Sequence, residues 1–214
     1  MGKTRSDLAG VVLSKAIKTA LVACEYSGIV RDALIAVGVD AVSCDLLPTD
    51  RPGPHIQGNV LEVLDQGWDL MVAHPPCTFL SNSGVAHLYK PGTRWQDLIA
   101  GAVFFRQLLN APIPRVCIEN PVIHKYAAAI IGRRQDQTIQ PYEHGHPESK
   151  RTALWLRGLP LLKPSHNVKA EYLAAPPAIG QRLFHVPPGP DRWKIRSQTF
   201  PGIAAAFANQ WGKQ

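Results

Sequence analysis

Short apolar runs alternate with helical patterns through the first two thirds of the chain, and this alternation restricts the fold more than any other feature. Four apolar runs have the length of buried strands, at residues 19–25, 41–46, 68–73 and 115–119. Three longer stretches carry apolar residues at helical spacing, at residues 29–37, 95–109 and 122–131. Strands that alternate with helices predict a mostly parallel sheet with helices on both faces, so we predict an α/β, Rossmann-like fold.

Shorter patterns complete this prediction. Residues 55–60 resemble a short strand, residues 61–66 a short helix, and residues 151–156 alternate as an antiparallel strand does. A proline-rich stretch with little periodicity, residues 160–190, is predicted to be an extended or loop segment packed on the domain, and residues 202–211 are predicted to form a short alanine-rich helix. We therefore divide the chain into a core, a short Pro-rich basic segment and a terminal helix that packs back on the core, at residues 1–157, 158–197 and 198–214.

Basic residues are concentrated in the final third. Residues 148–214 contain ten Lys and Arg against three acidic residues, whereas residues 1–147 contain thirteen of each sign. A basic segment that follows a neutral one indicates a polyanionic partner, and nucleic acid is the simplest such partner.

Membrane and metal-binding classes are not favoured. No apolar stretch reaches the roughly 18 residues that span a bilayer, and residues 1–18 lack the pattern of a signal peptide, so we expect a cytoplasmic protein without a membrane partner. The four cysteines form no Cys-x-x-Cys pair, and no His lies at zinc-ligand spacing from them. We therefore predict reduced thiols and no metal site.

Reactive or polar residues follow four of the predicted strands. They lie at Glu25–Gly28, Asp45, Pro75–Cys77 and Glu119–Pro121. Because ligands bind beyond the carboxyl ends of the strands in a parallel sheet, we expect these groups to surround one site.

Cys77 and Glu119 make a chemically specific pair within this set. Two prolines precede Cys77, and proline fixes its own φ angle, so the thiol is carried on a stiff turn. A carboxyl group such as Glu119 beside a thiolate suits attack on an electron-poor ring, because the acid can donate to a ring nitrogen while sulfur adds to carbon.

Together these residues resemble the DNA cytosine-5 methyltransferase family. Pro76-Cys77 resembles the nucleophile motif of the family, and Glu119-Asn120 resembles its Glu-Asn motif, where the family has Val in place of Pro121. Residues 147–155 are similar to its Gln-x-Arg-x-Arg segment, and residues 199–211 to its terminal motif, which returns to the cofactor pocket. The compact combination of HPPC, ENP and TFPGIA resembles small phage or prophage members of the family.

The resemblance implies a function and a set of site residues. It implies methyl transfer from S-adenosylmethionine to carbon 5 of cytosine in double-stranded DNA, with the base flipped out of the helix. The implied catalytic residues are Cys77, Glu119, and either Lys150 or Arg151, between which the alignment does not choose. The implied cofactor-binding residues are Glu25, Tyr26, Ser27, Gly28, Asp45, Leu46, Asn59, Val60 and Pro75.

In the implied mechanism, Cys77 adds to C6, Glu119 holds or protonates N3, and C5 then takes the methyl group. The chain departs from the family in having about forty residues, 158–197, where the family has a large target-recognition domain. A reduced recognition region predicts a short sequence context around the target cytosine.

Three alternatives stay open from the residues alone. The chain could be an amino-methyltransferase acting on adenine or cytosine, although Cys77 then stands where that class has an aromatic ring. It could be a catalytically silent nucleic-acid-binding protein of the same fold. It could also perform the C5 chemistry on RNA or on a free nucleotide, because the choice of DNA depends on the resemblance.

Overall fold

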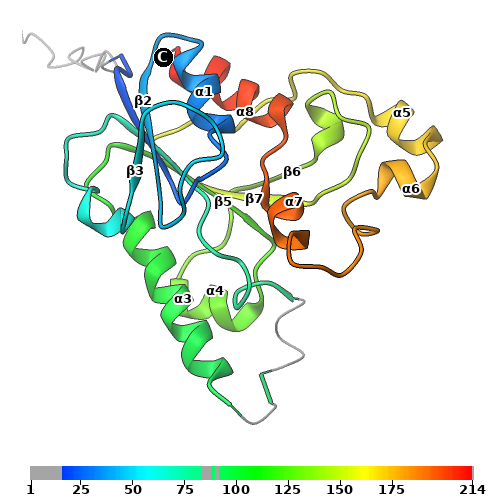
Figure 1. Cartoon of the computed structure of the whole chain (residues 1–214), viewed down its shortest axis with the longest axis horizontal. Helices are drawn as coiled ribbons and strands as arrows, with labels where there is room; N and C mark the ends of the chain where they lie inside the picture. Colours follow the sequence, from blue (N-terminus) through cyan, green and yellow to red (C-terminus); the bar gives the residue numbers. More distant parts are fainter. Residues whose placement is uncertain (1–15, 83–87, 90–91, 214) are drawn as a thin grey trace, which may run out of the picture.

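The computed structural model describes residues 16–82, 88–89 and 92–213 (Figure 1). The sequence predicted that residues 1–18 are not a signal peptide. Residues 1–15 of this stretch lie outside the described part. Seven strands of the described part form one sheet in the order β3-β2-β1-β4-β5-β7-β6. The strands are β1 Thr19–Ala23, β2 Asp40–Asp45, β3 His55–Gln57, β4 Leu70–Ala73, β5 Arg115–Pro121, β6 Gln137–Ile139 and β7 Thr152–Arg157.

The directions of the strands confirm the predicted α/β, Rossmann-like fold. The strands from β3 to β5 pair in parallel, and β7 runs antiparallel to both of its neighbours, β5 and β6. The antiparallel strand predicted at 151–156 is therefore confirmed as β7. Strand order reverses between β1 and β4, which makes the gap beyond their carboxyl ends the switch point where such sheets bind ligands.

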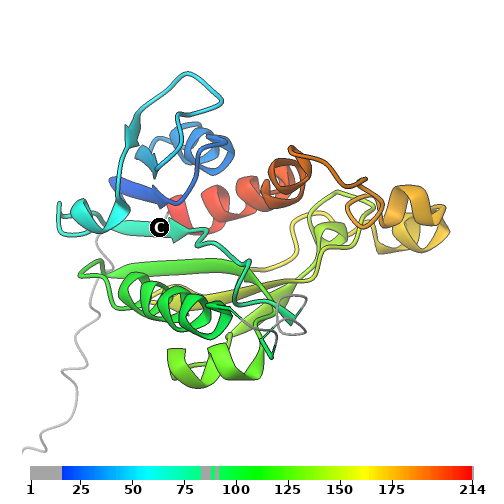
Figure 2. The same ribbon diagram turned by 60° about the horizontal axis from the view of Figure 1, so that its bottom comes forward.

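Helices cover both faces of the sheet, as predicted. Figures 1 and 2 show α1 and α8 on one face and α3 and α4 on the other. On the first face Val22 of β1 belongs to the same buried cluster as Leu34 and Phe207, and on the second Leu21 belongs to a cluster with Phe105. Alternate residues of a strand point to opposite faces, so β1 contributes to both cores. The four helices are α1 Ile29–Ile35, α3 Arg94–Leu109, α4 Lys125–Ile131 and α8 Pro201–Phe207.

The structure corrects two of the predicted elements. The helix expected at 61–66 is only a short 3-10 helix, Val60–Glu62. Asn59 caps its start, because the Asn59 side chain accepts a hydrogen bond from the Leu61 backbone N–H. The segment expected to be extended or a loop, 160–190, contains two short helices, α5 Lys169–Ala174 and α6 Pro177–Gly180. Proline favours the first turn of a helix, which explains why α6 begins at a proline where the sequence suggested extended chain.

The chain returns to the sheet after these helices. A third short helix, α7 Arg192–Ser197, precedes α8, which continues as one turn of π-helix, Ala208–Gly212. In Figure 1, α5 and α6 lie out to one side of the sheet, whereas α7 lies close to the carboxyl ends of the strands. No helix in the described part of the chain is long and apolar enough to cross a membrane.

Candidate active site

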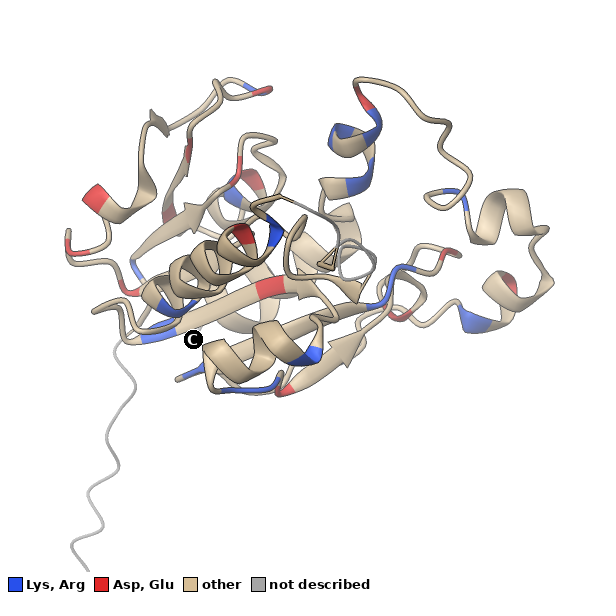
Figure 3. Cartoon of the chain, turned by 90° about the horizontal axis from the view of Figure 1, so that it is seen from below, with Lys and Arg blue, Asp and Glu red and all other residues tan. Residues whose placement is uncertain are grey.

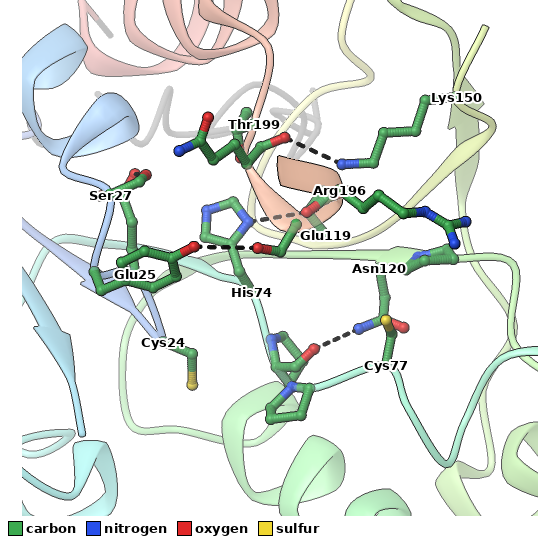
Figure 4. A pocket seen from close by; sticks show the side chains of 16 residues that line it. Cys24, Glu25, Ser27, His74, Cys77, Glu119, Asn120, Lys150, Arg196 and Thr199 are labelled. Carbon is green, nitrogen blue, oxygen red and sulfur yellow. Dashed lines mark hydrogen bonds and ion pairs between the residues drawn. The ribbon is translucent and has the colours of Figure 1, made fainter. Parts of the chain in front are cut away.

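A pocket of about 130 Å³ lies at the switch point of the sheet. It is lined by the residues that follow β1 and β4, by the last residues of β5, by a residue before β7, and by the end of α7 together with the segment that follows it. These are Cys24–Ser27, His74–Cys77, Glu119–Pro121, Lys150 and Arg196–Thr199 (Figure 4). The structure thus brings together three of the four strand-end groups that the sequence singled out, together with the start of the predicted terminal motif.

The turn after β1 is shaped by its own polar groups. Cys24 adopts a left-handed backbone conformation with φ of 57°, and Gly28 another with φ of 70°. The Glu25 carboxylate accepts hydrogen bonds from the backbone N–H groups of Val30 at 2.7 Å and Arg31 at 3.2 Å, so it caps the start of α1. Glu25 therefore lies at the pocket as predicted, but its charge is held by the helix that follows it.

The turn that carries Cys77 is fixed to the neighbouring strand. The side-chain amide of Asn120 donates a hydrogen bond of 2.7 Å to the Pro75 carbonyl, which ties the proline pair to β5. Burial raises the pKa of the Cys77 thiol, and the nearby Glu119 carboxylate raises it further, whereas Lys150 and Arg196 lower it. With the pKa raised overall, the Cys77 side chain is mainly a thiol at neutral pH.

Glu119 is buried beside Cys77, but its pKa is shifted in the opposite direction. Burial alone would raise its pKa, but a hydrogen bond from His74 and the positive charge of Lys150 outweigh burial, so the pKa is lowered. The distance from His74 Nδ1 to Glu119 Oε2 is 2.9 Å. Glu119 is therefore ionised at neutral pH.

Lys150 lies at the pocket, whereas Arg151 is exposed and does not line it. The Nζ atom of Lys150 donates a hydrogen bond of 3.2 Å to the Gln198 carbonyl. Of the two basic residues between which the sequence did not choose, Lys150 is the one placed to act on Cys77 and Glu119.

Five of the predicted cofactor-binding residues do not line this pocket. Asp45 and Leu46 follow β2, the strand next to β1, and the Asp45 side chain accepts a hydrogen bond from the Leu47 backbone at 3.0 Å. Near β3, the side chain of Asn59 caps a short 3-10 helix, as described above. The five residues are Gly28, Asp45, Leu46, Asn59 and Val60.

The end of α7 and the residues that follow it, Arg196–Thr199, line the pocket, and the sequence did not single out all of them. Trp193 of α7 lies against Tyr26, with ring centroids 5.7 Å apart, and the hydroxyl groups of Tyr26 and Ser197 share a hydrogen bond of 3.4 Å. Arg192, Lys194 and Arg196 give α7 a strong positive charge, and Figure 3 shows blue segments on this short helix, which follows Asp191. A tryptophan between basic residues was the available signal, since such interleaving is common in nucleic-acid-binding segments.

His74 was the other residue that the sequence did not assign. Its position in the sequence could have indicated a role at the site, because His74 directly follows the buried strand β4 and Glu119 lies near the end of the next strand, β5. Ala73 pairs with Ile118 in the sheet, which places His74 beside Glu119.

No protein-family model and no curated protein matches the chain. Among solved structures, it is similar to the Entamoeba histolytica methyltransferase EhMeth, with 14% identity and a TM-score of 0.46 over 72% of this chain and 58% of that one. It is also similar to a mutant of Spodoptera frugiperda DNMT2, with 15% identity and a TM-score of 0.35 over 71% of this chain and 54% of that one. The chain thus spans a little over half the length of each structure, and at this level of overlap neither neighbour bears on what the chain does.

Proposed function

We propose that the chain is an S-adenosylmethionine-dependent methyltransferase that methylates carbon 5 of cytosine in DNA. One observation carries the proposal. The Cys77 thiol and the Glu119 carboxyl, which come from the ends of neighbouring strands β4 and β5, line the same pocket as the turn after β1. A nucleophile and an ionisable acid therefore face one substrate next to the place where this type of sheet binds nucleotides.

The residues around the switch point fit such a cofactor. The β1 turn offers backbone groups and the aromatic ring of Tyr26 at the pocket, and the neighbouring strand β2 ends in Asp45. Asp45 would meet the ribose hydroxyls, because a carboxylate at the end of the adjacent strand is a good acceptor for a diol. Bound S-adenosylmethionine would supply the methyl group as an electrophile.

The side chains of the pocket can divide the chemistry between them. The Cys77 sulfur would form a bond to C6 of the base, which makes C5 nucleophilic, and Glu119 would hold the edge of the ring that carries N3. C5 would then gain the methyl group and lose its proton to a base such as water, and the bond between sulfur and C6 would break with its electron pair returning to Cys77 as the thiolate. Lys150 would favour the thiolate, because its charge lowers the pKa of Cys77.

DNA is the proposed substrate because the pocket is bordered by a basic surface. Lys150 and Arg196 line the pocket, and Arg196 belongs to α7, the short helix that also carries Arg192, Lys194 and the half-exposed ring of Trp193. Basic side chains bind phosphates and an aromatic ring can stack on a base. A base flipped from the duplex would enter the pocket between these groups.

Covalent trapping tests the proposal. Duplex DNA that contains 5-fluorocytosine should form a stable adduct with the protein when S-adenosylmethionine is present, because fluorine is not eliminated as a proton is. Cys77→Ser should abolish the adduct, whereas Cys117→Ala, which changes a buried thiol outside the pocket, should leave it. An adduct that survives Cys77→Ser contradicts the nucleophile, and an adduct that forms only with single-stranded RNA would assign RNA as the substrate.

A further inference from the structure

Four aromatic side chains gather near the turn that carries Cys77, at the starts of α3 and α4 and in the loop before α3. We call Tyr89, Trp95, His124 and Tyr126 the aromatic cluster. The ring centroid of Trp95 lies 5.1 Å from that of Tyr126 and 6.1 Å from that of Tyr89. The ring of His124 lies 4.8 Å from that of Tyr126. The proposed chemistry gives none of these residues a role.

Backbone hydrogen bonds join the aromatic cluster to the turn that carries the nucleophile. The Cys77 carbonyl accepts hydrogen bonds of 3.0 Å from the N–H groups of Leu80 and Ser81. The Leu80 carbonyl in turn accepts a hydrogen bond of 2.8 Å from the His124 N–H. Figure 2 shows α7 on the side of the sheet that α8 covers, whereas α3 and α4 cover the other side. The aromatic cluster therefore adjoins the pocket from the side away from α7.

The rings of the aromatic cluster are accessible although they contact one another. Tyr89 is 74% exposed and Trp95 is 39% exposed. The hydroxyl groups of Tyr89 and Tyr126 share a hydrogen bond of 2.9 Å, which together with the ring contacts fixes how the rings are turned. A ligand that stacks on rings held in this way has little further ordering to offset. Exposed apolar groups that gather in one place on a soluble protein commonly mark a binding site.

Positive charges accompany the aromatic cluster. The guanidinium carbon of Arg94 lies 4.7 Å from the centre of the Phe79 ring, and Nζ of Lys125 lies 5.2 Å from the centre of the Tyr126 ring. In the described part of the chain neither cation takes part in an ion pair. Cations beside exposed rings are the combination that binds single nucleic-acid strands, because the charges meet phosphates while the rings stack on bases.

We propose that the aromatic cluster binds an unpaired base of DNA next to the target cytosine, so that the chain prefers DNA that is single-stranded in this region. The inference rests on the proposed function for the identity of the nucleic acid. In an intact duplex the faces of a base are covered by its neighbours, and only base edges and the backbone meet a protein. A ring can therefore stack only on a base that has left the helix.

Three forms of one labelled DNA test the inference with the wild-type protein. They are a single strand, its duplex, and the same single strand with abasic sites on both sides of the target cytosine. By fluorescence anisotropy, the intact single strand should bind more tightly than the duplex and about tenfold more tightly than the abasic strand, the order expected from stacking one base. Both single strands carry the same phosphates, so equal affinity for the two would overturn the inference.

Substitution of Trp95 assigns the effect to the aromatic cluster. Trp95→Ala should lower the affinity for the single strand about tenfold and that for the duplex by less than about twofold, whereas a merely structural residue would affect both alike. Trp95→Phe keeps a ring and should retain most of the affinity. Val103→Ala, at an exposed position farther along α3, is the control and should change neither affinity. Equal losses for both DNA forms in Trp95→Ala, or no loss, would overturn the inference and leave the aromatic cluster to a protein partner.

Binding measured without S-adenosylmethionine keeps this inference distinct from the proposed function. A wild-type protein that prefers the intact single strand, but forms no adduct with 5-fluorocytosine, would refute the methyltransferase and leave the base-binding site intact. A protein that forms the adduct but does not distinguish intact from abasic strands would overturn the inference and leave the proposed function. Thermal unfolding of each variant shows whether it is folded under the assay conditions.

Discussion

Lys150 and Gln198 are joined across the edge of the pocket, because the Lys150 ammonium donates a hydrogen bond of 3.2 Å to the Gln198 carbonyl. The contact links the segment before β7 to the segment between α7 and α8, which are far apart in the sequence. The same ammonium lowers the pKa of both Cys77 and Glu119. One basic residue thus acts on both groups proposed to react with the base.

Removing this charge should therefore slow the reaction in a pH-dependent way. Lys150→Gln should raise the pKa of Cys77 further, and because the reactive form is the thiolate, the rate at a fixed neutral pH should fall by about tenfold. The rate of the wild type should rise with pH above neutrality, and the rise should lie at higher pH in the variant. Methyl transfer measured from pH 6.5 to 9.5 checks both statements. A larger loss for Arg151→Gln than for Lys150→Gln would transfer the role to Arg151.

Substitution of Asp45 should weaken binding of the cofactor and leave binding of the nucleic acid unchanged. Its position at the end of β2, beside the turn after β1, suits a contact with the ribose hydroxyls. Asp45→Ala should weaken S-adenosylmethionine binding by about tenfold, the order expected from losing one or two hydrogen bonds to a charged group, and leave DNA binding nearly unchanged. Calorimetry with each ligand measures the two affinities. Asp40→Ala, at the opposite end of the same strand, is the matched control, and equal losses in the two variants would remove Asp45 from the site.

The sequence could predict the parts of this fold and site that depend on buried strands. Apolar runs identified β1, β2, β4 and β5, and the rule that ligands bind at their carboxyl ends brought Cys77 and Glu119 into one pocket. Strand β6 was missed because it has only three residues and depends on its pairing with β7. Helix α7 has six residues, too few for a helical period to stand out, and the choice of Lys150 over Arg151 depends on tertiary contacts.

Acid should destabilise the fold through two histidines that link the segment after β6 to its surroundings. Burial, together with the neighbouring His146, lowers the pKa of His144 to about 4. Burial also lowers the pKa of His146, whose Nε2 accepts a hydrogen bond of 2.9 Å from the Gly202 N–H. Both folded-state pKa values lie below the unfolded value, so this stability is complete above about pH 6.5 and is lost as the pH falls from 6.5 towards 4.

The loss should be on the order of 1–3 kcal/mol, which urea unfolding at pH 7 and pH 5 would detect. His144→Gln should flatten the dependence of the unfolding free energy between these two pH values, because it removes the group whose pKa is lowered to about 4. The exposed His185 is the control, and His185→Gln should leave the slope as it is. An equal slope in His144→Gln and the wild type would place the acid sensitivity elsewhere.

Recognition of DNA should depend mainly on phosphates and only slightly on sequence. Reading a base requires a side chain against its edge in a groove, and each good bidentate contact gives roughly 1–3 kcal/mol of discrimination. The basic residues of α7, which are Arg192, Lys194 and Arg196, are of the kind that mostly bind phosphates. We therefore expect a short context of about two bases and dense methylation, since each base read needs such a contact.

The salt dependence of binding tests the same idea at the level of single residues. Each phosphate contact contributes about 0.9 to the slope of log affinity against log salt concentration. The double variant Arg192→Gln with Lys194→Gln should therefore reduce the slope by about 2, whereas Lys213→Gln, on the last turn near the chain end, should leave it unchanged. Methylation mapping on a plasmid treated with the purified protein supplies the sequence context. Modification confined to sites of four or more bases would contradict recognition through phosphates, because α7 and its neighbours would then have to read base edges. A complete absence of modification would point to a partner subunit that supplies recognition.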